Sequence, residues 1–208
     1  GLPFVLVYLA FLWSDSTPVK PVLSSAFFLP AFAAAFLQVL ATFLMIRLFM
    51  LRNFAVGSTY VRSEILMTAI IGALLFAEPV SLPGWAAIVI CVLGLVLVSV
   101  ARSGGLNGYW NRSALYGLGA GLAFSLTSLF IRSASLSLGL DSAALAAAIT
   151  LAFMVCIQTV ISLIWVCWNN AAELIIVLRR WRISLFIGVT SIVGSAGWFT
   201  AFTLERAA

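Results

Sequence analysis

Polar and ionisable residues interrupt one long apolar stretch of the chain, residues 55–77. Tyr60, Arg62 and Glu64 lie in the first half of this stretch, which is long enough to cross a bilayer as a helix. An ionised side chain at membrane depth is costly unless it is paired or faces water, so such residues are candidates for function. Glu64 could bind an amine or exchange a proton, and Arg62 could anchor an anionic group.

Arg62 and Glu64 cannot satisfy each other within one helix. Residues two positions apart project about 200° from each other, so each needs a partner on another helix or a watery cavity. In a functional interpretation, both side chains face a substrate path. In the alternative, Arg62 reaches the nearby membrane interface and Glu64 pairs with a basic residue of another helix. The sequence leaves both interpretations open.

Further polar candidates occur at helical spacing in other apolar stretches. In residues 113–133, small and polar residues recur every three or four positions, at Gly117, Gly121, Ser125, Ser128 and Arg132. Such stripes let two helices approach closely, so helix packing is their simplest role. Ser125 and Ser128 are the candidates for lining a translocation path.

Two more apolar stretches carry comparable residues. Gln38 lies within residues 27–51, and Ser191 and Trp198 lie within residues 181–204. Gln38 could offer a hydrogen bond to a substrate, and Trp198 a stacking surface. Interhelical packing with a hydrogen bond is an equally good account of each.

The elements that must position these residues are membrane-spanning helices. The chain is 64% hydrophobic and only 8% charged, whereas a soluble domain has about 25% charged residues. The apolar runs are continuous rather than alternating, which predicts an all-α, polytopic bundle and not a β-barrel. We expect spans at 27–51, 55–77, 82–101, 113–133, 142–167 and 181–204, a helix tail at 1–13 and an interfacial helix at 171–178.

The composition also restricts the chemistry. The chain has no histidine and no phosphate-binding loop, and Cys91, Cys156 and Cys167 lie apart within apolar runs. We therefore expect no catalytic triad, metal site or cofactor, and no enzymatic activity. The basic residues are scattered apart from residues 179–182, which indicates anchoring at the membrane interface rather than nucleic-acid binding. The rival functions are a membrane-embedded enzyme and a non-transporting scaffold.

The pattern of apolar stretches suggests an internal duplication. When Gln38 is aligned with Ser191, the span at 27–51 falls on the span at 181–204. We expect residues 1–103 to be a first repeat lacking its N-terminal part, and residues 113–208 a second repeat lacking its C-terminal part. A unit of five spans is odd, so two units must insert in opposite orientations, giving about ten spans, of which about six are present here.

One stretch, RNFAVGSTYVRSEILMTAIIGALLFAEPVSLPGWAAIVICVLGLVLVSVA, supports a resemblance to a family. It contains a Tyr-x-basic-Ser/Thr-Glu sequence from Tyr60 to Glu64, a glutamate closing a span at Glu78, and a final span with Trp85 and Gly94. These features resemble the EamA-type branch of the drug/metabolite transporter superfamily. Residues 181–208 are similar to the corresponding helix of a second EamA repeat.

The resemblance implies two inverted five-helix repeats around a central substrate cavity. It also implies a secondary transporter of a bacterial inner membrane that moves a small organic metabolite or drug, commonly outward, by alternating access. The expected partners are the small-molecule substrate, the lipid bilayer and a coupling proton. Family members usually have lysine where Arg62 stands; because arginine keeps its proton, any proton-coupling role shifts to Glu64.

Overall fold

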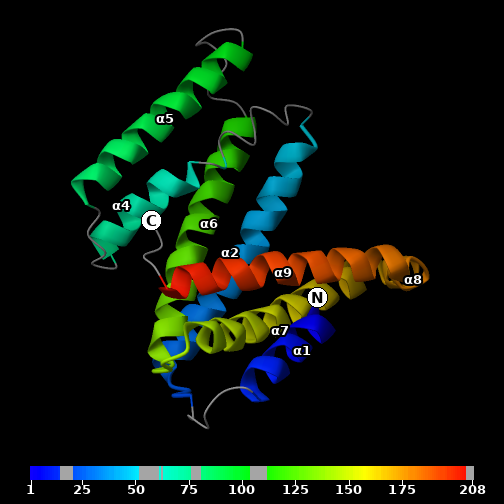
Figure 1. Cartoon of the computed structure of the whole chain (residues 1–208). Coiled ribbons are helices and arrows are strands. Elements are labelled where there is room, and N and C mark those ends of the chain that lie inside the picture. Colours follow the sequence, from blue (N-terminus) through cyan, green and yellow to red (C-terminus); the bar gives the residue numbers. More distant parts are fainter. Residues whose placement is uncertain (15–20, 52–60, 62, 76–80, 104–111, 205–208) are drawn as a thin grey trace. The chain divides into compact units, whose positions relative to one another are not determined.

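The computed structural model describes residues 1–14, 21–51, 61, 63–75, 81–103 and 112–204 (Figure 1). Every regular element in these ranges is an α-helix, which confirms the prediction of an all-α protein. The helices are α1 (Leu2–Ser14), α2 (Ser25–Phe49), α4 (Glu64–Leu75), α5 (Leu82–Ser103), α6 (Arg112–Ser137), α7 (Ala143–Asn170), α8 (Ala172–Arg179) and α9 (Trp181–Leu204).

Four of these helices are long and apolar enough to cross a membrane. They are α2, α6, α7 and α9, and they coincide with the spans predicted at 27–51, 113–133, 142–167 and 181–204. A helix suits such a sequence because it satisfies its backbone hydrogen bonds within one segment, without help from water. The structure therefore supports a membrane protein.

The other expected elements are helical where they are described. α5 covers the predicted span at 82–101, and α1 and α8 form where a helix tail and a short connecting helix were expected. Of the predicted span at 55–77, α4 accounts for Glu64–Leu75. Tyr60 and Arg62 lie outside the described residues, as do the other positions of that span on either side of α4, except Val61 and Ser63.

The helices form two compact units. Unit 1 comprises Gly1–Ala35 and Phe130–Glu205, and unit 2 contains Phe36–Leu129. The helices α2 and α6 each contribute to both units. A division into compact units does not show whether the chain contains a duplication. The inverted repeat therefore stays a prediction, as do its boundaries at 1–103 and 113–208 and the number of spans.

Unit 1 is built on α7, against which α1 and α9 pack. Its apolar core contains Phe27 together with alanines of α2, α6 and α7, and the half-buried Phe153 packs against it, with the two ring centroids 5.3 Å apart. In the same unit the Ser135 hydroxyl of α6 donates a hydrogen bond of 3.0 Å to the Thr150 hydroxyl of α7, and both side chains are buried. This is a direct polar link between two apolar helices.

Replacing Ser135 with alanine should weaken this link. Hydrogen bonds between membrane helices contribute on average about 0.6 kcal/mol and at most about 1.7 kcal/mol. We therefore expect Ser135→Ala to lower the free energy of unfolding by about 0.6–1.7 kcal/mol. The measurement is denaturant unfolding in detergent micelles. Ser137→Ala is the matched control, because the Ser137 hydroxyl donates to the Ala134 carbonyl of its own helix. Equal loss in both variants would contradict the link.

Candidate functional site

In unit 2, α6 lies between α2 and the start of α4, and it closely approaches both (Figure 1). A Cβ atom placed on Gly119 would lie 3.4 Å from Leu44 Cδ1 of α2. A Cβ atom placed on Gly121 would lie 3.1 Å from Ser63 Oγ and 3.2 Å from the Val61 carbonyl oxygen. Because the two glycines point to opposite sides of α6, the absence of side chains there lets both neighbours approach its backbone.

Glu64 stands at this close approach. It is the first residue of α4, and its amide nitrogen would be 3.3 Å from a Cβ atom on Gly121. Glu64, Thr68 and Gly72 recur every four residues, so they share one side of the helix, and Thr68 and Gly72 are buried. Glu64 itself is half-buried. The carboxyl group therefore starts on the packed side of α4, not on the side that exposes its large apolar residues.

Local interactions favour an acidic residue at this position. The start of a helix carries partial positive charge from its free N–H groups, which stabilises a nearby carboxylate. The Thr68 hydroxyl donates a hydrogen bond of 2.8 Å to the Glu64 carbonyl oxygen, which leaves the carboxyl group unaffected. Among the described residues, no basic side chain forms a salt bridge with Glu64.

Ser125 carries the second polar group on this side of α6. It lies one turn after Gly121, and its side chain is fully buried. Its hydroxyl oxygen has no hydrogen-bond partner, the one such buried side-chain atom in the part of the chain that the structure describes. Neighbouring hydroxyls are satisfied: Thr127 donates to the Ala123 carbonyl at 2.7 Å and Ser128 to the Ser125 carbonyl at 2.8 Å. An unpaired buried hydroxyl costs about 1–3 kcal/mol, so it calls for an explanation.

Gln38 and Ser128 complete the candidates in unit 2. Gln38 is half-buried on α2, at helical spacing from the buried residues Ala41 and Leu48, so it lies on the packed side of that helix. The backbone carbonyl oxygen of Gln38 accepts a hydrogen bond of 2.8 Å from the Thr42 hydroxyl. Ser128 is buried, but its hydroxyl is already bonded within α6. Ser128 is therefore a weaker ligand candidate than Ser125.

The remaining described candidates, Ser191 and Trp198, belong to unit 1. Both are exposed, Trp198 to 58%, while the adjacent Ile192 and Phe199 are buried. The packed side of α9 is thus rotated by about one residue from the stripe singled out in the sequence. The Trp198 ring packs edge-on against Phe202, with centroids 5.0 Å apart.

Arg132 has a structural contact that the sequence did not reveal. Its guanidinium Nη1 donates a hydrogen bond of 2.8 Å to the Phe202 carbonyl oxygen in the last turn of α9. The final carbonyls of a helix lack partners within the helix, so a cation at that end is favourable. Within unit 1, Arg132 therefore joins α6 to the end of α9.

The site thus consists of the Glu64 carboxylate at the start of α4 and the unpaired Ser125 hydroxyl, one turn after Gly121 on α6. Each group could accept a hydrogen bond from a solute that offers donors, such as an amine or a hydroxyl group. No group of three or more His, Cys, Asp or Glu residues that could hold a metal ion occurs among the described positions.

Comparison with protein-family models, with curated proteins and with solved structures found no match. The resemblance to EamA-type transporters therefore stays an expectation.

Adding a methyl group at Gly121 should disrupt the α4–α6 contact. Gly121→Ala would meet backbone as well as side-chain atoms at 3.1–3.3 Å, and overpacking of this kind costs about 1–3 kcal/mol. Gly119→Ala is the matched control, since its new methyl group would meet only the end of the flexible Leu44 side chain at 3.4 Å. Thermal unfolding in micelles compares the two variants. A Gly121→Ala protein as stable as Gly119→Ala would contradict the close approach.

Removing the Ser125 hydroxyl should not destabilise the protein. Because Ser125→Ala deletes an unpaired buried polar group, we expect the free energy of unfolding to be unchanged or to rise by about 1 kcal/mol. This is opposite in sign to the effect expected for Ser135→Ala, measured by the same denaturant titration. A clear loss of stability would show that the hydroxyl has a structural partner.

Proposed function

We propose that this protein is a secondary transporter that moves a small organic solute across a membrane by alternating access, without enzymatic chemistry. The chain offers four helices long enough to cross a membrane, and one of them, α6, carries a buried polar group beside the start of α4. The fully buried, unpartnered hydroxyl of Ser125 is the observation that carries the proposal. A solute that bonds this hydroxyl would recover the cost of leaving it unpaired, which makes occupancy favourable.

Glu64 supplies the charge in this proposal. Its half-buried carboxylate, on the packed side of α4, would bind the cationic or hydrogen-bond-donating part of the solute. It can also take up a proton, which would neutralise the site and allow the solute to leave. A proton moving along its gradient could then drive solute movement in the opposite direction, as in an exporter of the bacterial inner membrane.

The contact between α6 and the start of α4 suits a binding site that must open first to one side of the membrane and then to the other. At Gly121 the backbone of α6 closely approaches the Val61 carbonyl and the Glu64 amide at the start of α4, with no long side chain between them. A displacement of α6 would then alter the surroundings of both Glu64 and Ser125. The remaining candidates, Arg62, Tyr60, Gln38, Ser128, Ser191 and Trp198, are further positions for mutagenesis.

Transport assays on variants of the two central residues test the proposal. Cells producing the protein are loaded with ethidium or with a mixture of radiolabelled amino acids, and efflux is followed with and without a protonophore. Glu64→Gln should reduce protein-dependent efflux by about ten- to a hundred-fold, because a hydrogen bond to a charged group contributes about 1.5–3 kcal/mol. Ser125→Ala should reduce it by about five-fold or more, as expected for a neutral hydrogen bond of about 1 kcal/mol.

Two matched controls accompany these variants. Glu173→Gln also changes a glutamate in the first turn of a helix, but Glu173 is exposed on α8. Thr127→Val removes a hydroxyl that α6 already satisfies, because Thr127 donates to the Ala123 carbonyl of its own helix. Both should retain efflux at equal expression. If Glu64→Gln and Ser125→Ala behave like their controls with every probe that the wild type moves, the binding site is not at α4 and α6.

A further inference from the structure

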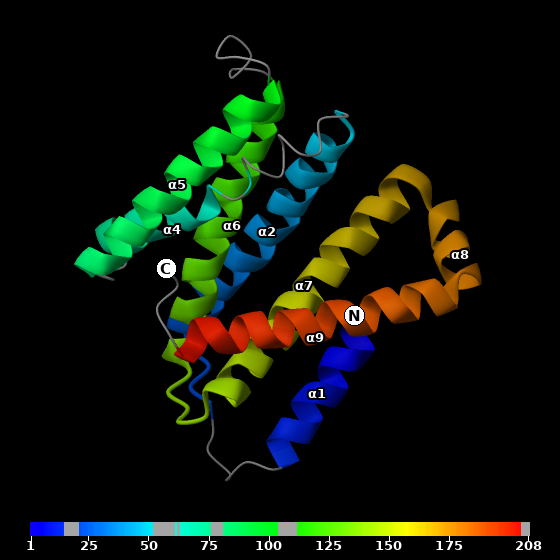
Figure 2. The same cartoon turned by 45° about the horizontal axis from the view of Figure 1, so that its top comes forward.

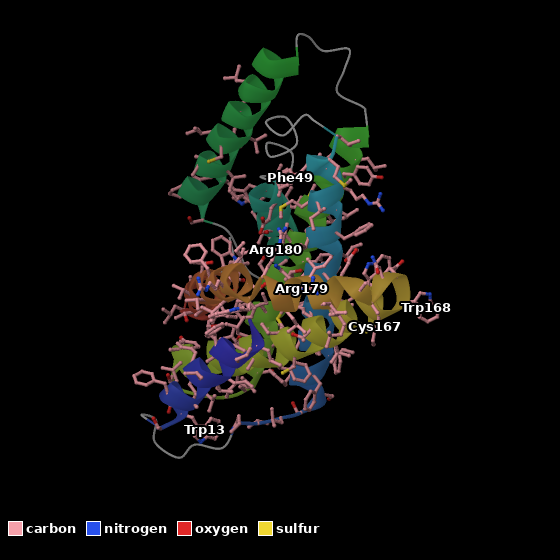
Figure 3. All side chains as sticks on the ribbon, turned by 90° about the vertical axis from the view of Figure 1, so that its right-hand side faces the viewer. Trp13, Phe49, Cys167, Trp168, Arg179 and Arg180 are labelled. Atoms are coloured by element: carbon pink, nitrogen blue, oxygen red, sulfur yellow. The ribbon has the colours of Figure 1, made fainter. Side chains whose placement is uncertain are left out.

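A basic surface lies at the end of unit 1 where α7 leads into α8 and α9. We call it the α8 surface and define it by five exposed side chains: Trp168, Arg179, Arg180, Trp181 and Arg182. Figure 3 shows Arg179 and Arg180 at the end of α8 and Trp168 beyond its beginning, where the indole projects outward. Trp168 is 87% exposed, an unusual position for a residue of its size.

The connectivity places this surface at one face of the membrane. α7 and α9 are both candidate spans, and α8 joins the end of one to the start of the next. In Figure 2 the two helices separate toward the end that carries α8, which bridges the gap. Where α7 and α9 both cross the membrane, the short helix that links their same-side ends lies at one membrane surface.

Helix length gives the depth of the α8 surface. α7 has 28 residues, or about 42 Å at 1.5 Å per residue. The hydrocarbon core of a bilayer is about 30 Å thick, so a centred α7 would extend about 6 Å beyond it at each end. Trp168, in the last turn of α7, would then lie at the headgroup depth where tryptophans are enriched.

The side chains divide into an apolar part and a cationic part. Ile175, Ile176, Val177 and Leu178, within α8, are all exposed. Arg179 ends α8, Arg180 follows it, and Arg182 lies in the first turn of α9, with its guanidinium 5.5 Å from the centroid of the Trp181 ring. The one acidic residue of α8, Glu173, is at the opposite end and accepts a hydrogen bond of 3.5 Å from Asn170. The C-terminal end therefore carries concentrated positive charge.

We infer that the α8 surface binds the headgroups of anionic phospholipids. The guanidinium groups of Arg179, Arg180 and Arg182 hold phosphate oxygens, for which arginine geometry is well suited. Trp168 and Trp181 lie at headgroup depth, and the apolar residues of α8 meet the upper acyl chains. This lipid site is separate from the proposed solute site at Glu64 and Ser125, and its test does not require transport.

Native mass spectrometry of the whole protein, released from micelles that contain phosphatidylglycerol and phosphatidylcholine with identical acyl chains, tests the inference. The wild type should retain phosphatidylglycerol preferentially. A triple variant, Arg179→Gln, Arg180→Gln and Arg182→Gln, should lose this preference by up to about 100-fold, given a gain of roughly five-fold per basic residue at an anionic surface. Replacing the same three arginines with lysine preserves the charge and should retain most of the preference.

Arg47→Gln is the matched control. Arg47 is an exposed arginine in the last turn of α2, with its guanidinium 5.0 Å from the Phe43 ring centroid, and it does not belong to the α8 surface. This variant should bind lipid as the wild type does. An unchanged phosphatidylglycerol preference in a folded triple-glutamine variant would overturn the inference. So would a change in oligomeric mass at constant lipid preference, which would assign the surface to a second copy of the chain.

Discussion

Hydrocarbon offers no hydrogen-bond partner to a polar group, and this constraint acts on both the backbone and the side chains of the described helices. It requires that backbone groups pair within helices, which the continuous apolar runs of the sequence allow. It also acts on side chains: Thr42, Thr68, Thr127 and Thr159 each donate to the carbonyl four residues earlier in their own helix. These threonines present mainly a methyl group to their surroundings. A polar atom left over in such an environment is therefore informative, and Ser125 Oγ is that atom.

The contact at Gly121 lies one turn before this atom on α6. Because α6 has no side chain there, the first turn of α4 reaches its backbone, and Glu64 begins a helix beside a small, partly polar face. Two residues that are far apart in the sequence thereby belong to one region of unit 2. Neither residue alone would indicate a site: a glutamate at a helix start is common, and a serine in an apolar helix usually bonds to its own backbone.

Much of this organisation could be predicted from the sequence. Continuous apolar runs located α2, α6, α7 and α9 to within a few residues, since length and hydropathy are strong signals for a spanning helix. The small-residue stripe of α6 was also visible, because glycine and serine at four-residue spacing have a clear packing role.

The sequence could not show which side of each helix is packed. In a soluble protein, the contrast between polar and apolar residues marks the buried side, but lipid-facing side chains are as apolar as the core. In α9 the stripe with Ser191 and Trp198 and the stripe with Ile192 and Phe199 are adjacent, and only the second is buried. Only tertiary packing could distinguish these stripes. The Arg132 contact with α9 was hidden for a related reason, since its acceptor is a backbone carbonyl that carries no sequence signal.

The unequal lengths of the two helices joined by α8 have a mechanical consequence. α7 has 28 residues and α9 has 24, a difference of about 6 Å along their axes. A longer span can fit the same hydrocarbon core through a larger tilt, and Figure 2 shows the two axes diverging toward α8. Where both helices cross the bilayer, a change in its thickness would therefore change the angle between α7 and α9.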